Sequence, residues 1–345
     1  MSFIETVLDV PSYGWKNLNG SLSKPSASQL FAEFRKKLNV FANRKNWLSF
    51  FSWFCMLLLA PFLVMFITMQ VQHFSIMYIL IAFVYGMIMM GTHGTIWYHR
   101  YCTHHSYTFK NKFWRFITAN LVLKLIPEEV YVISHHVHHA LSDKPGDPYN
   151  ARGGFLYCFL ADVNHQQISK NLSGADYERT AKMLRHTGIT ANSYAAYKKW
   201  GTVSKPFTVI AGTLANWAFW LAVFYFAGGL YLALAVFAGA FVWGMGVRTF
   251  NYEGHGKGKN KQVEGTDFNN ADMSVNQWWP GIVAGEWHNN HHLYPSSARS
   301  GFLPWQIDLA WYYIKALKWL GAVTSCRDAK QQFIKKYIRP SSQQP

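Results

Sequence analysis

The 345-residue chain has few charged residues and very few cysteines. Only 14% of its residues are Asp, Glu, Lys or Arg, against roughly 25% in a typical soluble domain. The four cysteines, Cys55, Cys102, Cys158 and Cys326, are far apart and form no CxxC pair. This pattern argues against a disulfide scaffold and a zinc ribbon. The N-terminal residues MSFIETVLDVPSYG have early acidic residues and no apolar core, so we expect no cleavable signal peptide.

Charged residues are absent from two long stretches of the sequence. Residues 46–98 and 206–247 contain no Lys, Arg, Asp or Glu, and a membrane-spanning helix needs about 20 apolar residues. Each stretch therefore has room for two spans joined by a short uncharged turn. The predicted spans are residues 47–69, 74–97, 206–226 and 230–247, with turns near 70–73 and at 228–229. Buried helices of a soluble protein are the weaker interpretation, because such proteins rarely contain charge-free runs of this length.

The net charge of +16 comes from basic residues that are scattered outside these stretches. No nucleic-acid-binding module is visible, so we expect the lipid bilayer and anionic substrates, and no nucleic acid, as partners. Basic residues flank the predicted spans on the side opposite both turns. By the positive-inside rule, both termini and the central segment are then cytoplasmic. The expected location is a bacterial inner membrane or the endoplasmic reticulum, with several spans.

These spans divide the sequence into five segments. They are a cytoplasmic N-terminal segment (1–45), a first hairpin (46–98), a cytoplasmic segment (99–205), a second hairpin (206–250) and a C-terminal cytoplasmic segment (251–345). Residues 113–125 and 304–320 combine aromatic and basic residues. They are predicted as interfacial helices or as helices packed within the cytoplasmic part.

Histidine is concentrated in three clusters, with one further histidine between the last two. The nine residues are His99, His104, His135, His138, His139, His255, His288, His291 and His292. The second and third clusters share the pattern His-x-x-His-His. On an α-helix, positions i, i+3 and i+4 lie on one face, so each triplet is expected to point at one place. The pair in the first cluster is about 140° apart on an α-helix and is expected to reach two neighbouring metals.

Nine imidazoles are too many for one metal ion and suit two. Neutral imidazole binds zinc, copper, iron and nickel, but a structural zinc site closes with four ligands. A nitrogen-rich site with open positions can bind and reduce O₂, which favours iron. A histidine-rich metal transporter is a remote alternative, because transporters place ionisable ligands within their spans. Here the clusters lie at or beyond the cytoplasmic span ends.

The clusters and their surroundings resemble those of the membrane-bound fatty acid desaturases, which include the acyl-CoA Δ9 desaturases. The resemblance runs from the first hairpin to about residue 323. HRYCTH at 99–104, SHHVHH at 134–139 and HNNHH at 288–292 match the three histidine boxes of the family. Asn251 and His255 match an Asn-x-x-x-His element that follows the fourth span. The four elements occur in the family's order.

The resemblance implies a centre of two iron ions, with O₂ as co-substrate. The nine histidines are then metal ligands, and Asn251 reaches a metal through water. The implied reaction inserts a cis double bond, of Δ9 type, into an acyl chain, with electrons from ferredoxin or from cytochrome b5 and its reductase. The expected fold is an all-α integral membrane protein with four transmembrane helices in two hairpins and a helical cytoplasmic cap that holds the two metals.

Departures from the family pattern bear on the substrate. Many acyl-CoA desaturases have Asp and Arg in the second box where this chain has Ser134 and His136. That Arg is linked to the CoA headgroup, so acyl-CoA, acyl lipid and free fatty acid all stay open as substrates. Glu286 is also one residue closer to the third box than in the family. Related diiron enzymes hydroxylate fatty acids or decarboxylate them to terminal alkenes, and the boxes do not separate these outcomes from desaturation.

Several residues beside the boxes are candidates for orienting the imidazoles. Asp143, Asp147 and Asn150 follow the second box, and a plain turn explains them equally well. The other candidates are Glu128, Glu129 and Glu286 as partners of imidazoles, His105 and His136 beside the ligands, and Lys257, Lys259 and Lys261 as headgroup contacts.

Overall fold

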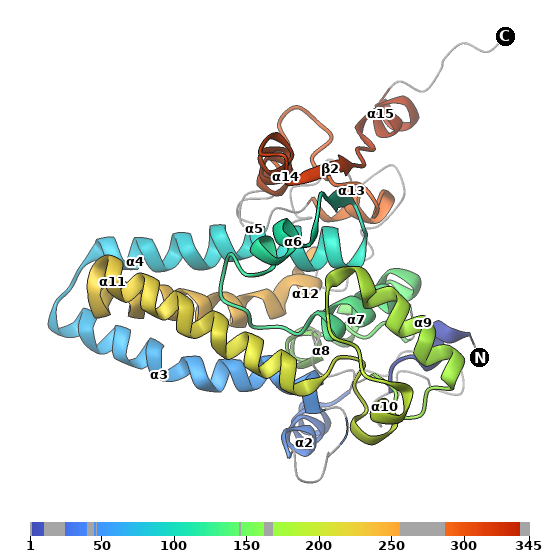
Figure 1. Ribbon diagram of the computed structural model, residues 1–345, viewed down its shortest axis with the longest axis horizontal. Coiled ribbons are helices and arrows are strands. Elements are labelled where there is room, and N and C mark those ends of the chain that lie inside the picture. Colours follow the sequence, from blue (N-terminus) through green and yellow to red (C-terminus); the bar gives the residue numbers. More distant parts are fainter. Residues whose placement is uncertain are drawn as a thin grey trace.

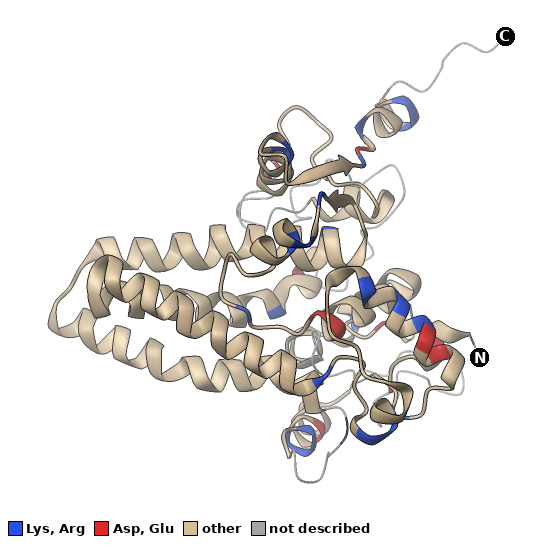
Figure 2. Ribbon diagram, viewed as in Figure 1, with Lys and Arg blue, Asp and Glu red and all other residues tan. Residues whose placement is uncertain are grey.

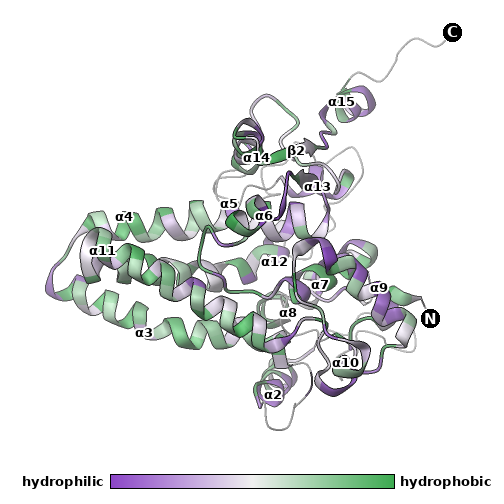
Figure 3. Cartoon of the chain, in the orientation of Figure 1, coloured by the Kyte–Doolittle hydropathy of each residue, from purple (hydrophilic) through white to green (hydrophobic). Residues whose placement is uncertain are grey.

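The computed structural model describes residues 2–9, 25–39, 45, 47–144, 146–161, 168–255 and 287–338. Long helices form a bundle, and the shorter helices gather at one end of it (Figure 1). Charged residues lie almost entirely at that end (Figure 2), and hydrophobic residues dominate the bundle (Figure 3). Among the described residues, three helices are long and apolar enough to cross a membrane.

The first two of these helices run in opposite directions, joined by a short turn (Figure 1). The first consists of η1 (Trp47–Phe50) and α3 (Phe51–Gln72), and it ends where the first turn was expected. The second begins with α4 (Ile76–Phe83) and continues through η2 (Val84–Met90), α5 (Gly91–Gly94) and η3 (Thr95–Thr103). Both η2 and η3 are π-helical, so the second helix is wound more loosely than an α-helix over much of its length.

The third long helix is broken in its middle. It consists of α11 (Pro206–Gly246), η6 (Val247–Thr249) and α12 (Phe250–Gly254). Gly228 (φ −159°, ψ 22°) and Gly229 (φ 72°, ψ −172°) leave the helical conformation at the expected turn. Gly229 has a positive φ, which glycine adopts without steric cost. The two halves of α11 then lie side by side in Figure 1 and pack against α3 and α4.

The bundle helices approach one another closely where glycines face each other. A Cβ atom added to Gly239 of α11 would collide with the carbonyl oxygen of Ala82 in α4, and one added to Gly86 would collide with the carbonyl oxygen of Gly239. Small residues at such crossings allow helix backbones to come into van der Waals contact. This contact fixes the second half of α11 against the helix that leads to His99.

The shorter helices form most of the other end of the molecule. They are α1 (Phe3–Thr6), α2 (Ala27–Leu38), α6 (Lys112–Ala119), α7 (Glu128–Leu141), η4 (Ala151–Gly153), α8 (Phe155–Ala161), α9 (Gly174–Leu184), η5 (Arg185–Thr187), α10 (Tyr194–Trp200), α13 (His288–Leu293), α14 (Leu309–Trp319), α15 (Lys330–Phe333) and η9 (Ile334–Ile338). Ser173 and Ser193 cap α9 and α10 by accepting hydrogen bonds from backbone amides.

The expectation of a purely helical fold is wrong in one detail. β1 (Tyr107–Phe109) and β2 (Val323–Cys326) form a two-stranded antiparallel sheet. The chain leaves the helix directly after the first histidine cluster and pairs with the segment that follows α14. This pairing ties the first cluster to the C-terminal part of the protein.

The two predicted amphipathic helices are shorter than expected. α14 begins only at Leu309, capped by Asp308, and α6 ends at Ala119. Residues 120–124 bond to α11 instead of continuing α6: Asn216 accepts from the Lys124 amide (3.0 Å) and donates to the Val122 carbonyl (3.1 Å). Trp217 Nε1 donates to the Lys124 carbonyl (2.8 Å). Side chains of α11 thus satisfy the backbone groups of a non-helical segment.

Candidate metal centre

All nine histidines of the clusters come together where the long helices meet the shorter ones. They form two groups, and within each group one ring nitrogen per residue lies within 4.8 Å of the others. The first group is His99, His104, His135, His139 and His291, and the second is His138, His255, His288 and His292. The groups adjoin each other, since the rings of His139 and His292 stack with centroids 4.5 Å apart. Each group can hold a metal ion.

The expectation that each His-x-x-His-His triplet points at one place is wrong. In α7, His135 and His139 belong to the first group and His138 to the second; in α13, His288 and His292 belong to the second and His291 to the first. Successive residues of an α-helix point about 100° apart. The rings at positions i and i+4 of each triplet therefore share one group, and the ring at i+3 points toward the other group.

The expectation for the first cluster is also wrong, because His99 and His104 share one group. They lie at the end of η3, which is π-helical, and the His104 amide donates to the His99 carbonyl five residues earlier (3.1 Å). In a π-helix, residues five apart lie one above the other. Their rings are therefore near neighbours, with centroids 5.0 Å apart.

The outer nitrogens of three imidazoles are bonded to the protein. Nδ1 of His138 lies 2.9 Å from Asp147, Nδ1 of His255 lies 3.0 Å from Asp143, and Nδ1 of His135 lies 2.9 Å from the Tyr149 hydroxyl. Such contacts fix the tautomer and orientation of metal-binding histidines. Asp143 and Asp147 therefore contact imidazoles, whereas Asn150 donates to the Lys144 carbonyl (3.0 Å) and accepts from the Arg152 amide (2.9 Å), as in a plain turn.

Asp147, whose carboxylate contacts His138 of the second group, is itself held in place by backbone amides. Asp147 Oδ2 accepts from the Asp143 amide (3.0 Å), and its Oδ1 accepts from the Tyr149 amide (3.1 Å). Burial raises the pKa of Asp147 to about 8. A positive ion among the histidines favours the ionised carboxylate, because an opposite charge nearby lowers the pKa of an acid.

The inner nitrogens fit a metal. Nε2 of His104 and Nε2 of His138 are buried and have no hydrogen-bond partner within the described ranges. Nε2 of His139 lies 3.1 Å from Nε2 of His135 and 3.0 Å from Nε2 of His291, which brings three ring nitrogens to one place. The lone pairs of neutral ring nitrogens that face one another repel, and a metal cation between them would remove this repulsion.

Burial also keeps these imidazoles neutral. It lowers the pKa well below the ordinary histidine value for seven of them: His104, His135, His138, His139, His288, His291 and His292. Neutral imidazole is the form that binds a metal. The donor set therefore suits a pair of transition-metal ions.

Two of the residues that were expected to orient imidazoles form bonds with other residues. Glu128 pairs with Lys124 (3.1 Å) and accepts from Trp97, and Glu129 accepts from the Ser204 amide. The expectation that these two glutamates orient imidazoles of the clusters is thus not supported by their contacts. Asn251 is buried one helical turn before His255. The Asn251 carbonyl accepts a hydrogen bond from the His255 amide (3.1 Å). The contact of Asn251 with a metal through water stays a prediction.

Other expected residues lie beside the two groups or outside the described ranges. The ring of His105 packs against His186, with centroids 3.4 Å apart, and the ring of His136 lies 6.3 Å from that of His104. Neither His105 nor His136 belongs to a group. Glu286, Lys257, Lys259 and Lys261 lie outside the residues that the structure describes.

A buried ion pair beside the first cluster was not expected from the sequence. Arg100 donates to Asp308 (2.9 Å), to the Ala298 carbonyl (2.6 Å) and to Ser300 Oγ (3.0 Å). Ser300 Oγ in turn accepts from the amide of Trp287, the residue before His288 (3.1 Å). This network joins the first and third boxes. Its only signal in the sequence is a charged residue next to His99, at the end of an apolar stretch.

The fold and the site define a helical protein with three membrane-length helices and two adjoining histidine groups that can hold metals. The sequence model of the fatty acid desaturase family matches residues 74–322, which include every histidine of both groups. The chain belongs to the fatty acid desaturase family. It is therefore an oxidoreductase that acts on fatty acids.

Similar proteins with curated descriptions carry the same activity in their names. The acyl-CoA C20 Δ5-desaturase of Anemone leveillei is 28% identical over 245 residues, covering 69% of this chain and 70% of that protein. The Δ9 acyl-lipid desaturase 2 of Arabidopsis thaliana is 27% identical over 250 residues, covering 68% and 69%. The chloroplastic palmitoyl-monogalactosyldiacylglycerol Δ7 desaturase of the same plant is 30% identical over 217 residues, covering 57% and 47%.

Proposed function

We propose that the protein is an O₂-dependent diiron desaturase that inserts a cis double bond, of Δ9 type, into a fatty acyl chain. The observation that carries the proposal is the pair of adjoining histidine groups with inward nitrogens, in a chain of the desaturase family. Removal of two hydrogens while O₂ is reduced to two waters takes two further electrons. These come from an external donor, such as ferredoxin or cytochrome b5 with its reductase.

The histidine groups divide the ligand roles between two irons. His99, His104, His135, His139 and His291 hold one, and His138, His255, His288 and His292 hold the other, with Asn251 acting through water. When bound, the irons supply the O₂-derived oxidant that an unactivated methylene requires. The protein contributes orientation and exclusion of water: Asp147 and Asp143 hold the protons on Nδ1 of His138 and His255, and burial keeps water from the centre.

The position of the double bond and the substrate form belong to the proposal. The relatives are named for the Δ5, Δ7 and Δ9 positions and for acyl-CoA and acyl-lipid substrates. We propose Δ9 on the resemblance of the histidine boxes to Δ9 enzymes. Acyl-CoA, acyl lipid and free fatty acid are the substrate forms to compare.

The proposed topology has four spans, with the metal centre and both termini in the cytoplasm. Two features support it: the break at Gly228 and Gly229 divides α11 into halves of span length, and the charged residues gather at the end opposite the turns (Figure 2). A straight helix with the 41 residues of α11 would extend about 60 Å, about twice the roughly 30 Å of a bilayer core.

Expression in a cell with a simple lipid profile tests the activity. The acyl products of the wild-type chain are compared by mass spectrometry with those of His139→Ala. We expect a new cis-monounsaturated acyl chain, with its double bond at C9, only with the wild-type chain. Hydroxylated acyl chains or shortened terminal alkenes would instead assign the related hydroxylase or decarboxylase chemistry. Identical products from both chains would exclude catalysis through these histidines.

A further inference from the structure

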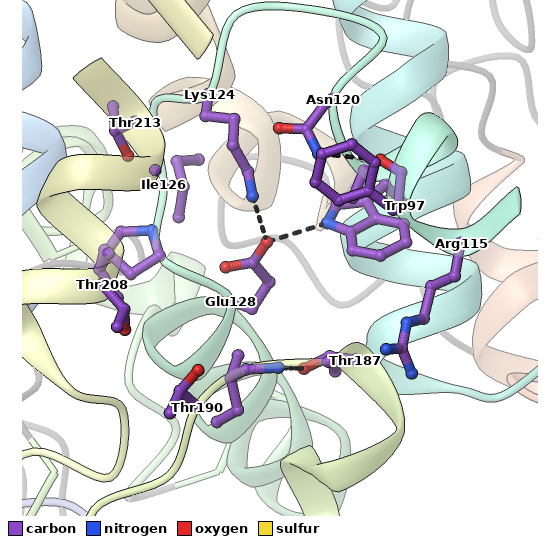
Figure 4. Close-up of a pocket in the computed structure, with 17 residues that line it drawn as sticks. Trp97, Arg115, Asn120, Lys124, Ile126, Glu128, Thr187, Thr190, Thr208 and Thr213 are labelled. Atoms are coloured by element: carbon purple, nitrogen blue, oxygen red, sulfur yellow. Dashed lines mark hydrogen bonds and ion pairs between the residues drawn. The ribbon is translucent and has the colours of Figure 1, made fainter. Parts of the chain in front are cut away.

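A cavity of about 230 Å³ is lined by residues of α6, of α11, of η3 and of the segments 124–128 and 187–190 (Figure 4). Its lining includes apolar side chains, among them Phe116, Ile126 and Val209. It also includes hydroxyl groups, from Thr187, Thr190, Thr208 and Thr213. The cavity therefore suits a ligand with both an apolar and a polar part.

The charged side chains of the lining leave one positive charge without a balancing carboxylate. Lys124 is paired with Glu128 (3.1 Å), and Trp97 Nε1 donates to the same Glu128 oxygen (3.3 Å). The third charged residue, Arg115, donates to the His186 carbonyl (3.0 Å). Within the described part of the chain, no carboxylate lies within ion-pair distance of Arg115.

A glycine makes room for this guanidinium. Gly188 has φ 91°, and a Cβ atom placed there would lie 2.7 Å from Nη2 of Arg115. A side chain at this position would push the Arg115 head aside. The position of the Arg115 guanidinium at the cavity wall therefore requires glycine at position 188.

The cavity lies at the level where the bundle meets the shorter helices. Phe113 and Phe116 of α6 and Phe207 at the start of α11 are exposed, by 61%, 65% and 80%. Exposed aromatic residues beside apolar spans are typical of the membrane interface. An amphiphile in the bilayer has its head group at this level.

Two elements connect the cavity to the metal centre. Trp97 lines the cavity and lies two residues before His99 in η3. Glu128 lines it from the first turn of α7, and His135 of the first group lies seven residues further along that helix, about 10 Å away. An acyl chain with its head in the cavity would have to extend about 10 Å along α7 to bring its methylenes to His135.

We propose that this cavity binds the anionic head end of the fatty acyl substrate, with Arg115 as its counter-ion. The chemistry is a singly charged oxyanion on an acyl chain: the carboxylate of a free fatty acid or the phosphate diester of a phospholipid. This assignment rests on the proposed desaturase function. Pockets that enclose drug-sized ligands measure roughly 300–1,000 Å³, so the cavity suits a small head group better than a nucleotide.

Ligand binding to the full-length protein in an uncharged detergent tests the assignment without turnover. Displacement of radiolabelled hexadecanoic acid is measured with three competitors: unlabelled hexadecanoic acid, hexadecanol and hexadecanoyl lysophosphatidylglycerol. Because a hydrogen bond to a charged group is at stake, we expect the acid to bind roughly ten- to a hundred-fold more tightly than the alcohol. Equal affinity of acid and alcohol for the wild-type protein would overturn the assignment.

Three substitutions at two positions of α6 test whether Arg115 causes this preference. Arg115→Gln is expected to remove the preference for the acid, and Arg115→Lys to keep most of it. Lys112→Gln is the matched control, because Lys112 is exposed on α6, carries the same charge and does not line the cavity. A preference that survives Arg115→Gln, or that is lost equally in Lys112→Gln, contradicts the assignment.

The competitors also identify the source of the oxyanion. Arg115-dependent displacement by lysophosphatidylglycerol at least as strong as by the acid assigns a phospholipid head, and displacement by the acid alone assigns a free fatty acid. A wild-type protein that prefers the acid but forms no double bond overturns the proposed function and leaves the anion site in place. A wild-type protein that forms the double bond but shows no preference for the acid overturns the anion site and leaves the proposed function in place.

Discussion

At the scale of single residues, the metal centre depends on the carboxylates that contact Nδ1 of its imidazoles, Asp147 at His138 and Asp143 at His255. Asp147 holds His138 and is itself fixed by two backbone amides. We expect Asp147→Asn to lower iron affinity or activity roughly ten- to a hundred-fold, as loss of such outer contacts does in other metal sites. Iron per protein, measured by elemental analysis, checks this. Asp176 of α9, which is half-buried and belongs to neither group, provides the control Asp176→Asn. Equal iron content in both variants would contradict the role of Asp147.

Histidines inside and outside the groups make a second comparison. His291→Ala removes a ring of the first group, whereas His136→Ala removes a ring that belongs to neither group. We expect the first variant to lose most bound iron and the double-bond product, and the second to retain most of both. The measurement is iron content together with product analysis of the same preparations. If His136→Ala abolishes iron binding and His291→Ala does not, the division into two groups is wrong.

At this scale, the sequence indicates which histidines matter but not how they are shared. Nine of the chain's fifteen histidines were singled out by spacing and resemblance, and the structure brings those nine together. The spacing within each helix puts the rings at i and i+4 in one group, but which group each pair joins depends on how α7 and α13 pack together, which no local pattern encodes. Arg100 and Asp308 are more than two hundred residues apart, so their pairing is visible only in the folded chain.

Among the helices, Gly239 of α11 lies directly against the backbone of α4. Gly239→Val would push its side chain into the Ala82 carbonyl, and overpacking costs about 1–3 kcal/mol or more. We therefore expect a lower thermal unfolding midpoint in detergent. Gly246→Val is the control, because a Cβ atom at Gly246 meets no atom within 4 Å. Equal midpoints for the two variants would argue against close helix contact here.

The sequence predicts the apolar helices better than their internal geometry. Charge-free runs placed the first turn and the break in α11, because long apolar stretches and paired glycines are local signals. The π-helical winding of η3 has no such signal, since it depends on how that helix packs. The early end of α6 was also missed, because residues 120–124 form their hydrogen bonds with Asn216 and Trp217, about a hundred residues away.

On the scale of the whole molecule, metal binding should contribute to the stability of the fold. The groups join the end of η3, α7, His255 and α13, which are four separate parts of the sequence. A ligand that binds only the folded state at a thousand times its Kd stabilises it by about 4 kcal/mol. We expect chelation to lower the thermal midpoint and added Fe(II) to restore it. His139→Ala should show a smaller shift, and no shift in the wild-type protein would contradict metal binding by these groups.

The exchange of ligands between α7 and α13 has a consequence for how the centre assembles. Each helix gives two rings to one group and one ring to the other, so neither helix can settle around one ion without positioning rings for the second. The first ion bound therefore prepares the place of the next. Loading with iron should be cooperative, and protein that carries a single ion should be scarce at every stage of a titration.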